Sequence, residues 1–331
     1  VGTQSKDAAF TTIAKKTMEE IKEASQLLMQ QALHNKADGV VALIGTASST
    51  TSIIVSSPYG VSGAGQGSLL LSVGDYIAVL DTSSSDAVLG RSAITAISNS
   101  GDNATLTLGT AISGMAATDK IVKATASDTS FNAAMNGLIN ITNRGGSYAS
   151  LHNISASSYS IWDATRMVAG TDTPDVNQPT ESDIWDLIQK ISGRSGKDAM
   201  VRPKDFLLMT TPGLAKKLME SMVGQRRFTA GEFSTTIKGG YKALEVCGIP
   251  MVTDYYVPAG TVYLLHIPSL SWVDAKDWGF VEFEGAGPWR WLSGRDAFET
   301  TYGWYGNLAC LARNAHGSIT GYTDTARYTH V

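Results

Sequence analysis

The chain has 331 residues, of which 43% are hydrophobic and 17% are charged, and its formal net charge at pH 7 is −4. This composition allows a buried core in two domains, or in one domain with a large insertion, and excludes a disordered chain. The small acidic excess argues against a dedicated nucleic-acid-binding protein, which usually carries a strong basic excess.

The cysteine content and the N-terminal residues bear on the compartment. Two cysteines, Cys247 and Cys310, cannot form a disulfide framework, so they favour a reducing environment. No run of about 18 apolar residues occurs, and we expect no transmembrane helix and no membrane partner. The first ten residues are polar and no apolar run follows them, so we expect no signal peptide.

Residues 7–35 are predicted to form one long amphipathic helix. Its apolar positions recur at steps of three and four: Phe10, Ile13, Thr17, Ile21, Ala24 and Leu28. Charged residues occupy the opposite face, Asp7 is a suitable start, and Ala37-Asp38-Gly39 is a suitable stop with glycine in the left-handed conformation. At about 29 residues the helix exceeds the usual globular length.

The composition changes at residue 40. Residues 40–126 contain few charges, no tryptophan, and many small and β-branched residues. Short β-type runs recur between turn clusters at 52–55, 76–80, 93–97, 105–108 and 120–122. This spacing predicts a separately folding β-insertion, a small barrel or sandwich.

Helices and strands alternate in the second half of the chain. We expect helices at 129–142, 182–191 and 212–222, the second with cap-type residues from Thr180 to Asp183 and the third opened by Pro212. Strands are expected at 205–209, 249–252 and 262–265, which makes 176–285 a mixed α/β unit. From 286 onward the chain is aromatic and strand-like.

The sequence contains no convincing catalytic motif. Gly193-Arg194-Ser195-Gly196-Lys197 lacks the spacing and the hydroxyl residue of a phosphate loop, so a surface turn after a helix is preferred. Gly63 to Gly67 has no strand–helix context and is interpreted as a loop. The five histidines lack metal-ligand spacing, and neither cysteine has a general base nearby in the sequence. We therefore expect no cofactor, no metal site and no catalytic residue.

The aromatic strands leave one binding alternative open. Acidic residues lie among them at Asp274, Asp277, Glu282 and Glu284, so a glycosidase pair is conceivable but unsupported. The tryptophans could stack on sugars, whereas packing at a sheet or subunit interface is the preferred interpretation.

The loop between the predicted helix 212–222 and the strand near Ala243 is long for a compact domain. Its arginines and aromatic residues are suited to contact a neighbouring subunit, and a solvated loop is the alternative. The candidate intersubunit contacts are Arg226, Arg227, Phe228, Glu232, Phe233 and Lys238.

Two stretches carry a family resemblance. The first runs from Ala243 to Asp254 through Gly248-Ile249-Pro250 and continues from Pro258 to Tyr263. The second runs from Asp277-Trp278 through 295–299 and Trp304-Tyr305 to 312–315. Together with the order of parts, they resemble the HK97-fold major capsid proteins of tailed double-stranded DNA bacteriophages, over most of 1–40 and 129–322.

This resemblance implies an α+β, HK97-like capsid fold with an inserted small β-barrel or β-sandwich. It implies a spine helix of the peripheral domain at 1–39, the β-insertion at 40–126 and more of the peripheral domain at 127–175. The axial domain would span 176–285, and 286–331 would supply the closing peripheral strands and the tail. The family places an N-terminal arm and an extended hairpin before the spine helix, whereas about six residues precede it here.

The function implied is self-assembly into hexamers and pentamers of an icosahedral shell. Such a protein would be located in the virion, would be assembled in the host cytoplasm, and would enclose double-stranded DNA without sequence specificity. Decoration and portal proteins are possible further partners. The alternatives are an encapsulin-type compartment shell and a glycan-binding or glycan-cleaving protein built on the Trp/Tyr strands.

Overall fold

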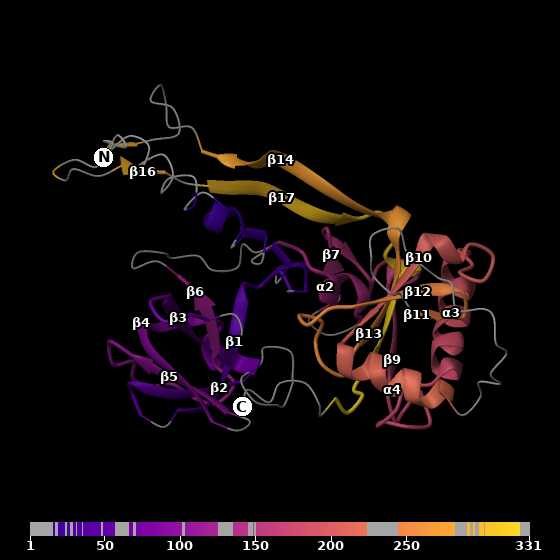
Figure 1. The fold of residues 1–331 in the computed structure, drawn as a ribbon, viewed down its shortest axis with the longest axis horizontal. Coiled ribbons are helices and arrows are strands. Elements are labelled where there is room, and N and C mark those ends of the chain that lie inside the picture. Colours follow the sequence, from indigo (N-terminus) through magenta and orange to yellow (C-terminus); the bar gives the residue numbers. More distant parts are fainter. Residues whose placement is uncertain are drawn as a thin grey trace, which may run out of the picture.

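The computed structural model describes parts of 16–34 and residues 36–47, 49–56, 66–68, 71–100, 103–124, 135–144, 148, 150–223, 244–281, 290–291, 294, 298–300 and 302–324. These residues form a closed barrel, a six-stranded sheet with helices, and a long hairpin that extends from the sheet (Figure 1). Short 3₁₀ turns occur at Gln66–Ser68, Thr82–Ser84, Ser160–Trp162, Pro203–Asp205, Ile267–Ser269 and Arg313–Ala315.

The N-terminal helix precedes the barrel. The described residues between Lys16 and Leu33 are helical, and His34 lies in the turn after them. Gly39 has a φ of 69°, the left-handed conformation that the sequence predicted for it. The predicted start at Asp7 lies outside the described residues.

Six antiparallel strands close into the barrel in the order β1-β2-β5-β4-β3-β6. They are β1 (Val40–Ala47), β2 (Ser52–Ser56), β3 (Tyr76–Asp81), β4 (Ala87–Ser100), β5 (Asn103–Leu108) and β6 (Lys120–Lys123). Alternate side chains fill the interior, among them Ile53, Ile77 and Leu106, all with no exposed surface. Pairing of β1 with β6 closes the barrel and makes Val40 and Val122 Cα partners, so the chain enters and leaves the barrel at one place.

The second half of the chain is built on a mixed sheet of order β11-β12-β10-β13-β18-β9. Its strands are β9 (Thr165–Val168), β10 (Phe206–Thr210), β11 (Leu244–Val246), β12 (Ile249–Thr253), β13 (Val262–His266) and β18 (Gly317–Thr320). All five residues of β13 are buried because both faces of this strand are covered. Since β9 and β18 lie outside 176–285, the sheet also uses segments expected in the peripheral domain, and the domain boundaries remain predictions.

Helices α3 (Glu181–Ser195) and α4 (Pro212–Val223) cover one face of this sheet (Figure 1). A capping box between Thr180 and Asp183 starts α3, and Pro212 is the first residue of α4, as their sequences predicted. Helix α3 continues past the predicted end at Ile191 to Ser195, and left-handed Gly196 closes it. The glycine-rich segment at 193–197 is therefore mostly the last turn of a helix.

The opposite face of the sheet is covered by the short helix α2 (Leu138–Thr142) and the base of the long hairpin. Tyr263 and Leu265 of β13 pack there with Leu138 and Ile141. The predicted helix at 129–142 is wrong at its described positions before Leu138. Gly137 is extended, with a φ of −113° and a ψ of 175°, and Asn136 forms a β-bridge with Lys36. The apolar spacing of a helix is present there, but the backbone of Asn136 pairs with Lys36 and is not helical.

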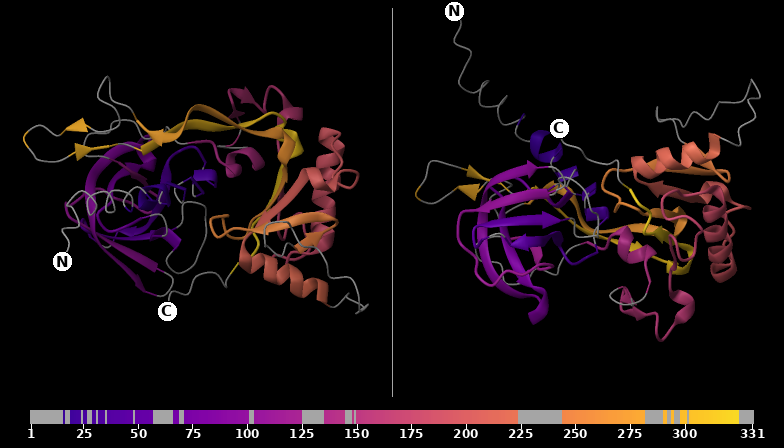
Figure 2. Two further views of the ribbon diagram at one scale, coloured as in Figure 1. Left: turned by 45° about the horizontal axis from the view of Figure 1, so that its top comes forward. Right: turned by 90° about the horizontal axis from the view of Figure 1, so that it is seen from below.

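The long hairpin consists of β14 (Leu270–Phe280) and β17 (Tyr302–Cys310), which pair antiparallel along their length. It leaves the sheet and runs out past the N-terminal helix, on the side of the barrel (Figures 1 and 2). Two short ladders complete the described strands: β7 (Ser150–Leu151) with β8 (Ile154–Ser155), and β15 (Arg290–Trp291) with β16 (Phe298–Glu299).

Candidate functional surfaces and cavity

The contact residues predicted from the sequence are not among those placed. Arg226, Arg227, Phe228, Glu232, Phe233 and Lys238 all lie outside the described residues. Their contact role remains a prediction. The surfaces that the structure does describe are the long hairpin, two polar clusters that anchor it, and a cavity between barrel and sheet.

Aromatic rings gather on one face of the hairpin. Trp278 stacks on Tyr302 and Trp304 with ring centroids 5.7 and 6.0 Å apart, and Trp272 meets Trp304 edge-to-face at 5.7 Å. The Trp304 indole N–H donates to Asp274 Oδ1 at 2.7 Å. These ring contacts pack the two strands of the hairpin against each other.

The acidic residues considered for sugar cleavage have local partners where the structure describes them. Asp274 accepts the Trp304 indole proton, and Asp277 accepts the backbone N–H of Trp278 at 2.7 Å. Glu282 and Glu284 lie outside the described residues. The structure therefore assigns Asp274 a local packing role.

Apolar side chains are exposed along the same hairpin and at its end. Val273 and Tyr305 are each 56% exposed, Trp272 is 44% exposed, and Leu311, just after β17, is 70% exposed. Among the described residues, β14 and β17 pair with each other and with no third strand. A groove of about 960 Å³ separates the hairpin from the N-terminal helix, lined by residues that include Met29, Ala32 and Trp304. These features combine exposed apolar surface with open strand edges.

A buried cluster of His266, Ser269 and His316 fixes the base of the hairpin, where β13 turns into β14. His316 Nδ1 accepts the backbone N–H of His266 at 3.2 Å, so a neutral His316 donates from Nε2 to Ser269 Oγ at 2.8 Å. Burial, followed by the charges of His266 and Lys197, lowers the His316 pKa to about 3. Ser269 is 3% exposed and cannot meet a substrate, so the cluster is structural.

A second polar contact joins the N-terminal helix to the end of β12. His34 Nε2 and Gln30 Nε2 lie 3.3 and 3.1 Å from Asp254 Oδ2. Burial opposes ionisation of Asp254, but hydrogen bonds from His34, the Tyr256 backbone and Gln30 outweigh it and lower the pKa to about 2. Asp254 therefore stays charged and holds the helix against the sheet.

Arg313, which has no exposed surface, binds backbone carbonyls of α2 and of Asn143 and Tyr148. Its Nη2 donates to the carbonyls of Asn140, Asn143 and Tyr148 at 3.1, 2.7 and 2.7 Å, and its Nε donates to Ile141 O at 3.3 Å. Asp163 Oδ1 lies 3.7 Å from Nη1. Burial lowers the Arg313 pKa and the Asp163 charge opposes this effect. Sequence reasoning gave Arg313 no role, because no local pattern distinguishes a buried arginine from a solvated one.

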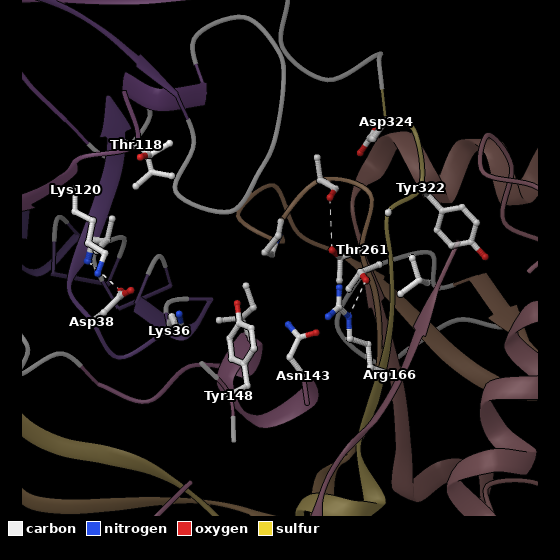
Figure 3. Close-up of a pocket in the computed structure, with 18 of the residues that line it drawn as sticks. Lys36, Asp38, Thr118, Lys120, Asn143, Tyr148, Arg166, Thr261, Tyr322 and Asp324 are labelled. Atoms are coloured by element: carbon white, nitrogen blue, oxygen red, sulfur yellow. Dashed lines mark hydrogen bonds between the residues drawn. The ribbon is translucent and has the colours of Figure 1, made fainter. Parts of the chain in front are cut away.

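A cavity of about 740 Å³ with both polar and apolar lining lies between the barrel and the sheet. Figure 3 shows Lys120 and Thr118 on the barrel side of the cavity and Asn143, Tyr148 and Arg166 on the sheet side. Lys36 and Asp38, which precede β1 in the sequence, also line it. Lys120 is engaged by Asp86 at 2.8 Å. The remaining lining includes Thr261, Tyr322 and Asp324. Volume and lining fall in the range of small-molecule sites.

The other sequence candidates have structural roles. Cys247 Sγ donates to Glu181 Oε1 at 3.6 Å, and burial followed by the Glu181 charge raises its pKa to about 11. Burial likewise raises the pKa of Cys310 to about 11. Neither thiol is thus activated as a nucleophile. His152 Nε2 accepts the backbone N–H of Cys310 at 3.1 Å.

Two searches of the described residues bear on metals and membranes. No group of three or more His, Cys, Asp or Glu side chains in the placed part of the chain is arranged to hold a metal ion. Among the placed helices, none has the length and apolar character needed to cross a bilayer.

Among known proteins, similarity to this chain was found only in solved structures. No family model and no curated protein matches the chain. The cyanophage A-1(L) capsid is similar over 58% of this chain and 61% of its own, at 14% identity and a TM-score of 0.41. The SrpI encapsulin complex from Synechococcus elongatus is similar over 50% and 56%, at 15% identity and a TM-score of 0.34. The satellite phage P4 procapsid is similar over 48% and 41%, at 12% identity and a TM-score of 0.29.

These similar structures are phage capsids and an encapsulin shell. The chain spans between 41% and 61% of their lengths.

Proposed function

We propose that this chain is a shell-forming subunit, the major capsid protein of a tailed double-stranded DNA bacteriophage with an HK97-like fold. The observation that carries the proposal is the long hairpin β14–β17. An isolated two-stranded sheet is marginally stable in water, and exposed apolar side chains on it favour a contact with another chain. Repeated symmetric contacts of one subunit type close into rings and shells.

The parts of the fold have matching roles in this proposal. The N-terminal helix and the hairpin form the peripheral part, and the sheet with α3 and α4 forms the axial part. The enclosed DNA would be met through sequence-independent electrostatics, and portal or decoration proteins would bind the assembled shell. The protein would assemble in the host cytoplasm and reside in the virion, with no catalytic role for Lys197 or Asp274.

The main experiment compares assembly of hairpin variants with assembly of a matched control. Val273→Thr with Tyr305→Ser removes apolar surface from the hairpin. Val201→Thr with Tyr159→Ser makes the same changes at positions that are 74% and 62% exposed elsewhere. Electron microscopy and light scattering should show megadalton particles for the native protein and the control, and few for the hairpin variant. A native protein that stays monomeric under assembly conditions would refute the proposal.

The particle contents distinguish a capsid from an encapsulin-type compartment. Particles from the native source should protect double-stranded DNA of genome length from nuclease. Particles that hold a protein cargo and no such DNA would favour the compartment shell.

The predicted contact loop can be tested in the same assay. Arg226→Ala with Arg227→Ala should leave the circular dichroism spectrum intact and lower the particle yield, because the arginines would lose their carboxylate partners on a neighbour. A normal spectrum with a normal yield would show that the loop makes no such contact.

We also propose that 40–126 is an insertion in the capsid fold. Val40 and Val122 are paired, so a short Gly/Ser linker can replace the barrel without moving its two attachment points. Loop closure costs only about 0.6 kcal/mol per doubling of loop length, so the host fold should tolerate the exchange. The deletion variant should stay folded, as judged by tryptophan fluorescence, and global unfolding would contradict this boundary.

A further inference from the structure

The cavity between barrel and sheet brings together donors from segments far apart in the sequence. Arg166 comes from β9, Asn143 follows α2, and Lys36 follows the N-terminal helix. In Figure 3 the Asn143 and Tyr148 side chains point into the space, with Arg166 beside Asn143. Lys36 lies 4.8 Å from the centre of the Tyr148 ring.

Asn143 has donor capacity that the described residues do not use. Its side chain is buried, with 5% exposure, and its Oδ1 accepts from Ser318 Oγ at 3.4 Å. Its amide nitrogen makes no hydrogen bond with any residue that the structure places, and it lines the cavity. The amide nitrogen therefore offers a donor to whatever fills the cavity, water or a ligand.

Arg166 supplies the charge at the same end of the cavity. The side chain is exposed at the cavity, and its Nε donates to Thr320 Oγ1 at 3.2 Å, which favours one orientation of the guanidinium. Within the described part of the chain, its two terminal nitrogens have no hydrogen-bond acceptor. A planar guanidinium held in this way is suited to bind two oxygens of one anion.

Tyr148 is a neutral donor at this site. Burial raises the pKa of its phenol, the Asp38 charge raises it further, and the Arg166 charge lowers it. The hydroxyl therefore keeps its proton at neutral pH. Because the charges of both Asp38 and Arg166 affect the pKa of Tyr148, its phenol lies between the Asp38 end and the Arg166 end of the cavity.

The site is preorganised. Arg313 holds the carbonyls of both Asn143 and Tyr148 through one nitrogen, at 2.7 Å each. The backbones of Asn143 and Tyr148 are thus held by one side chain without a ligand, which lowers the entropic cost of binding.

We propose that this cavity binds the phosphate group of a small molecule, held by Arg166, the Asn143 amide and the Tyr148 hydroxyl, with Lys36 as the second positive charge. The cavity exceeds the size of phosphate alone, so the rest of the molecule would extend towards Thr118 and Asp38. Asp38 and Asp324 also line the space and disfavour a polyanion, so the ligand is a small phosphate and not a nucleic-acid backbone.

The experiment is a calorimetric titration of the full chain at constant ionic strength with inorganic phosphate, adenosine monophosphate and a short DNA duplex. Inorganic phosphate and the monophosphate should bind saturably at one site per chain, and the DNA should not compete. Arg166→Gln should weaken phosphate binding about tenfold or more, since a charge-assisted contact is lost. Arg202→Gln makes the same charge change at an exposed arginine outside the cavity and should leave binding unchanged.

A second variant tests the amide. Asn143→Asp keeps the shape and the acceptor for Ser318 but places a negative charge in the cavity, so phosphate binding should be lost while the circular dichroism spectrum is unchanged. Absence of saturable phosphate binding to the native chain, or equal binding by Arg166→Gln, would overturn the proposal. Effective competition by the duplex would instead identify a nucleic-acid site. Assembly is not measured in this test, so its result is independent of the proposed shell function.

Discussion

The barrel and the long hairpin are both antiparallel β-structures, but in the described part of the chain the barrel has no unpaired strand edge, whereas both strands of the hairpin have one. In the barrel every strand has two hydrogen-bonded neighbours, and Ile53, Ile77 and Leu106 are completely enclosed. In the hairpin, β14 and β17 have only each other among the described strands. Val273 and Tyr305 are each 56% exposed and line the groove beside the N-terminal helix.

The difference shows that one type of local structure can serve two purposes. A closed barrel satisfies its own backbone groups and buries its own apolar surface, so it needs no partner. An open hairpin leaves both requirements unmet, and a contact with another chain meets them. The barrel should therefore respond to substitutions as a self-contained domain, and the hairpin as part of an interface.

The largest expected effect is in the barrel core. Leu106→Ala should destabilise the barrel by about 3 kcal/mol, because it removes buried methyl groups and leaves a cavity that the closed strands cannot fill. Hydrogen exchange of barrel amides in urea measures this change. A destabilisation below about 1 kcal/mol would show that neighbouring side chains in the barrel move to fill the cavity.

The second largest effect is expected at acid pH, which should destabilise the base of the hairpin and leave the barrel unchanged. The His316 pKa of about 3 in the folded chain is below its ordinary value of 6.5, so the unfolded state binds more protons below pH 6.5. Stability at the hairpin base is therefore full above pH 6.5 and is lost as the pH falls towards 3, by about 2 kcal/mol at pH 5. Urea unfolding followed by tryptophan fluorescence tests this, because residues 40–126 contain neither histidine nor tryptophan.

The barrel supplies the control for this pH dependence. Amide exchange of β1–β6 should be insensitive to the change from pH 7 to pH 5 once the intrinsic exchange rate is corrected. An equal loss in both regions would mean that they unfold as one cooperative unit.

A smaller effect is expected from the hairpin glycines. A Cβ on Gly306 would lie 2.6 Å from Asp274 Oδ1 and would also overlap the Trp304 ring, whereas a Cβ on Gly303 would meet only Val281, at 3.8 Å. Gly306→Ala should cost about 1–2 kcal/mol and shift the tryptophan emission, because it separates the indole from Asp274. Gly303→Ala should do neither, and identical spectra for the two variants would contradict this packing.

The smallest expected effect is on the unassembled subunit. Val273→Thr should change its free energy of unfolding by less than about 0.5 kcal/mol, because the side chain is largely exposed. Denaturant unfolding of the monomer measures this. A loss above about 1 kcal/mol would place Val273 in the subunit's own core and remove it from the proposed interface.

The sequence alone determined those parts of the molecule that depend on local patterns. Apolar runs between turn clusters predicted β2 to β6 of the barrel but not β1. The Thr180–Asp183 cap predicted the start of α3, and Pro212 predicted the start of α4. The failure at Met135 to Gly137 has the same origin, because helical spacing was present there without helical hydrogen bonding.

Only the tertiary structure decided which distant segments meet. Strands β9 and β18 are about 150 residues apart and pair in the sheet, and the same fold places Arg166, Asn143, Tyr148 and Lys36 around one cavity. Arg313 has no exposed surface because four carbonyls and Asp163 surround it. The residues next to it in the sequence give no sign of this burial. Local periodicity is encoded in adjacent residues, whereas these contacts arise from the packing of the whole chain, so they could not be predicted from it.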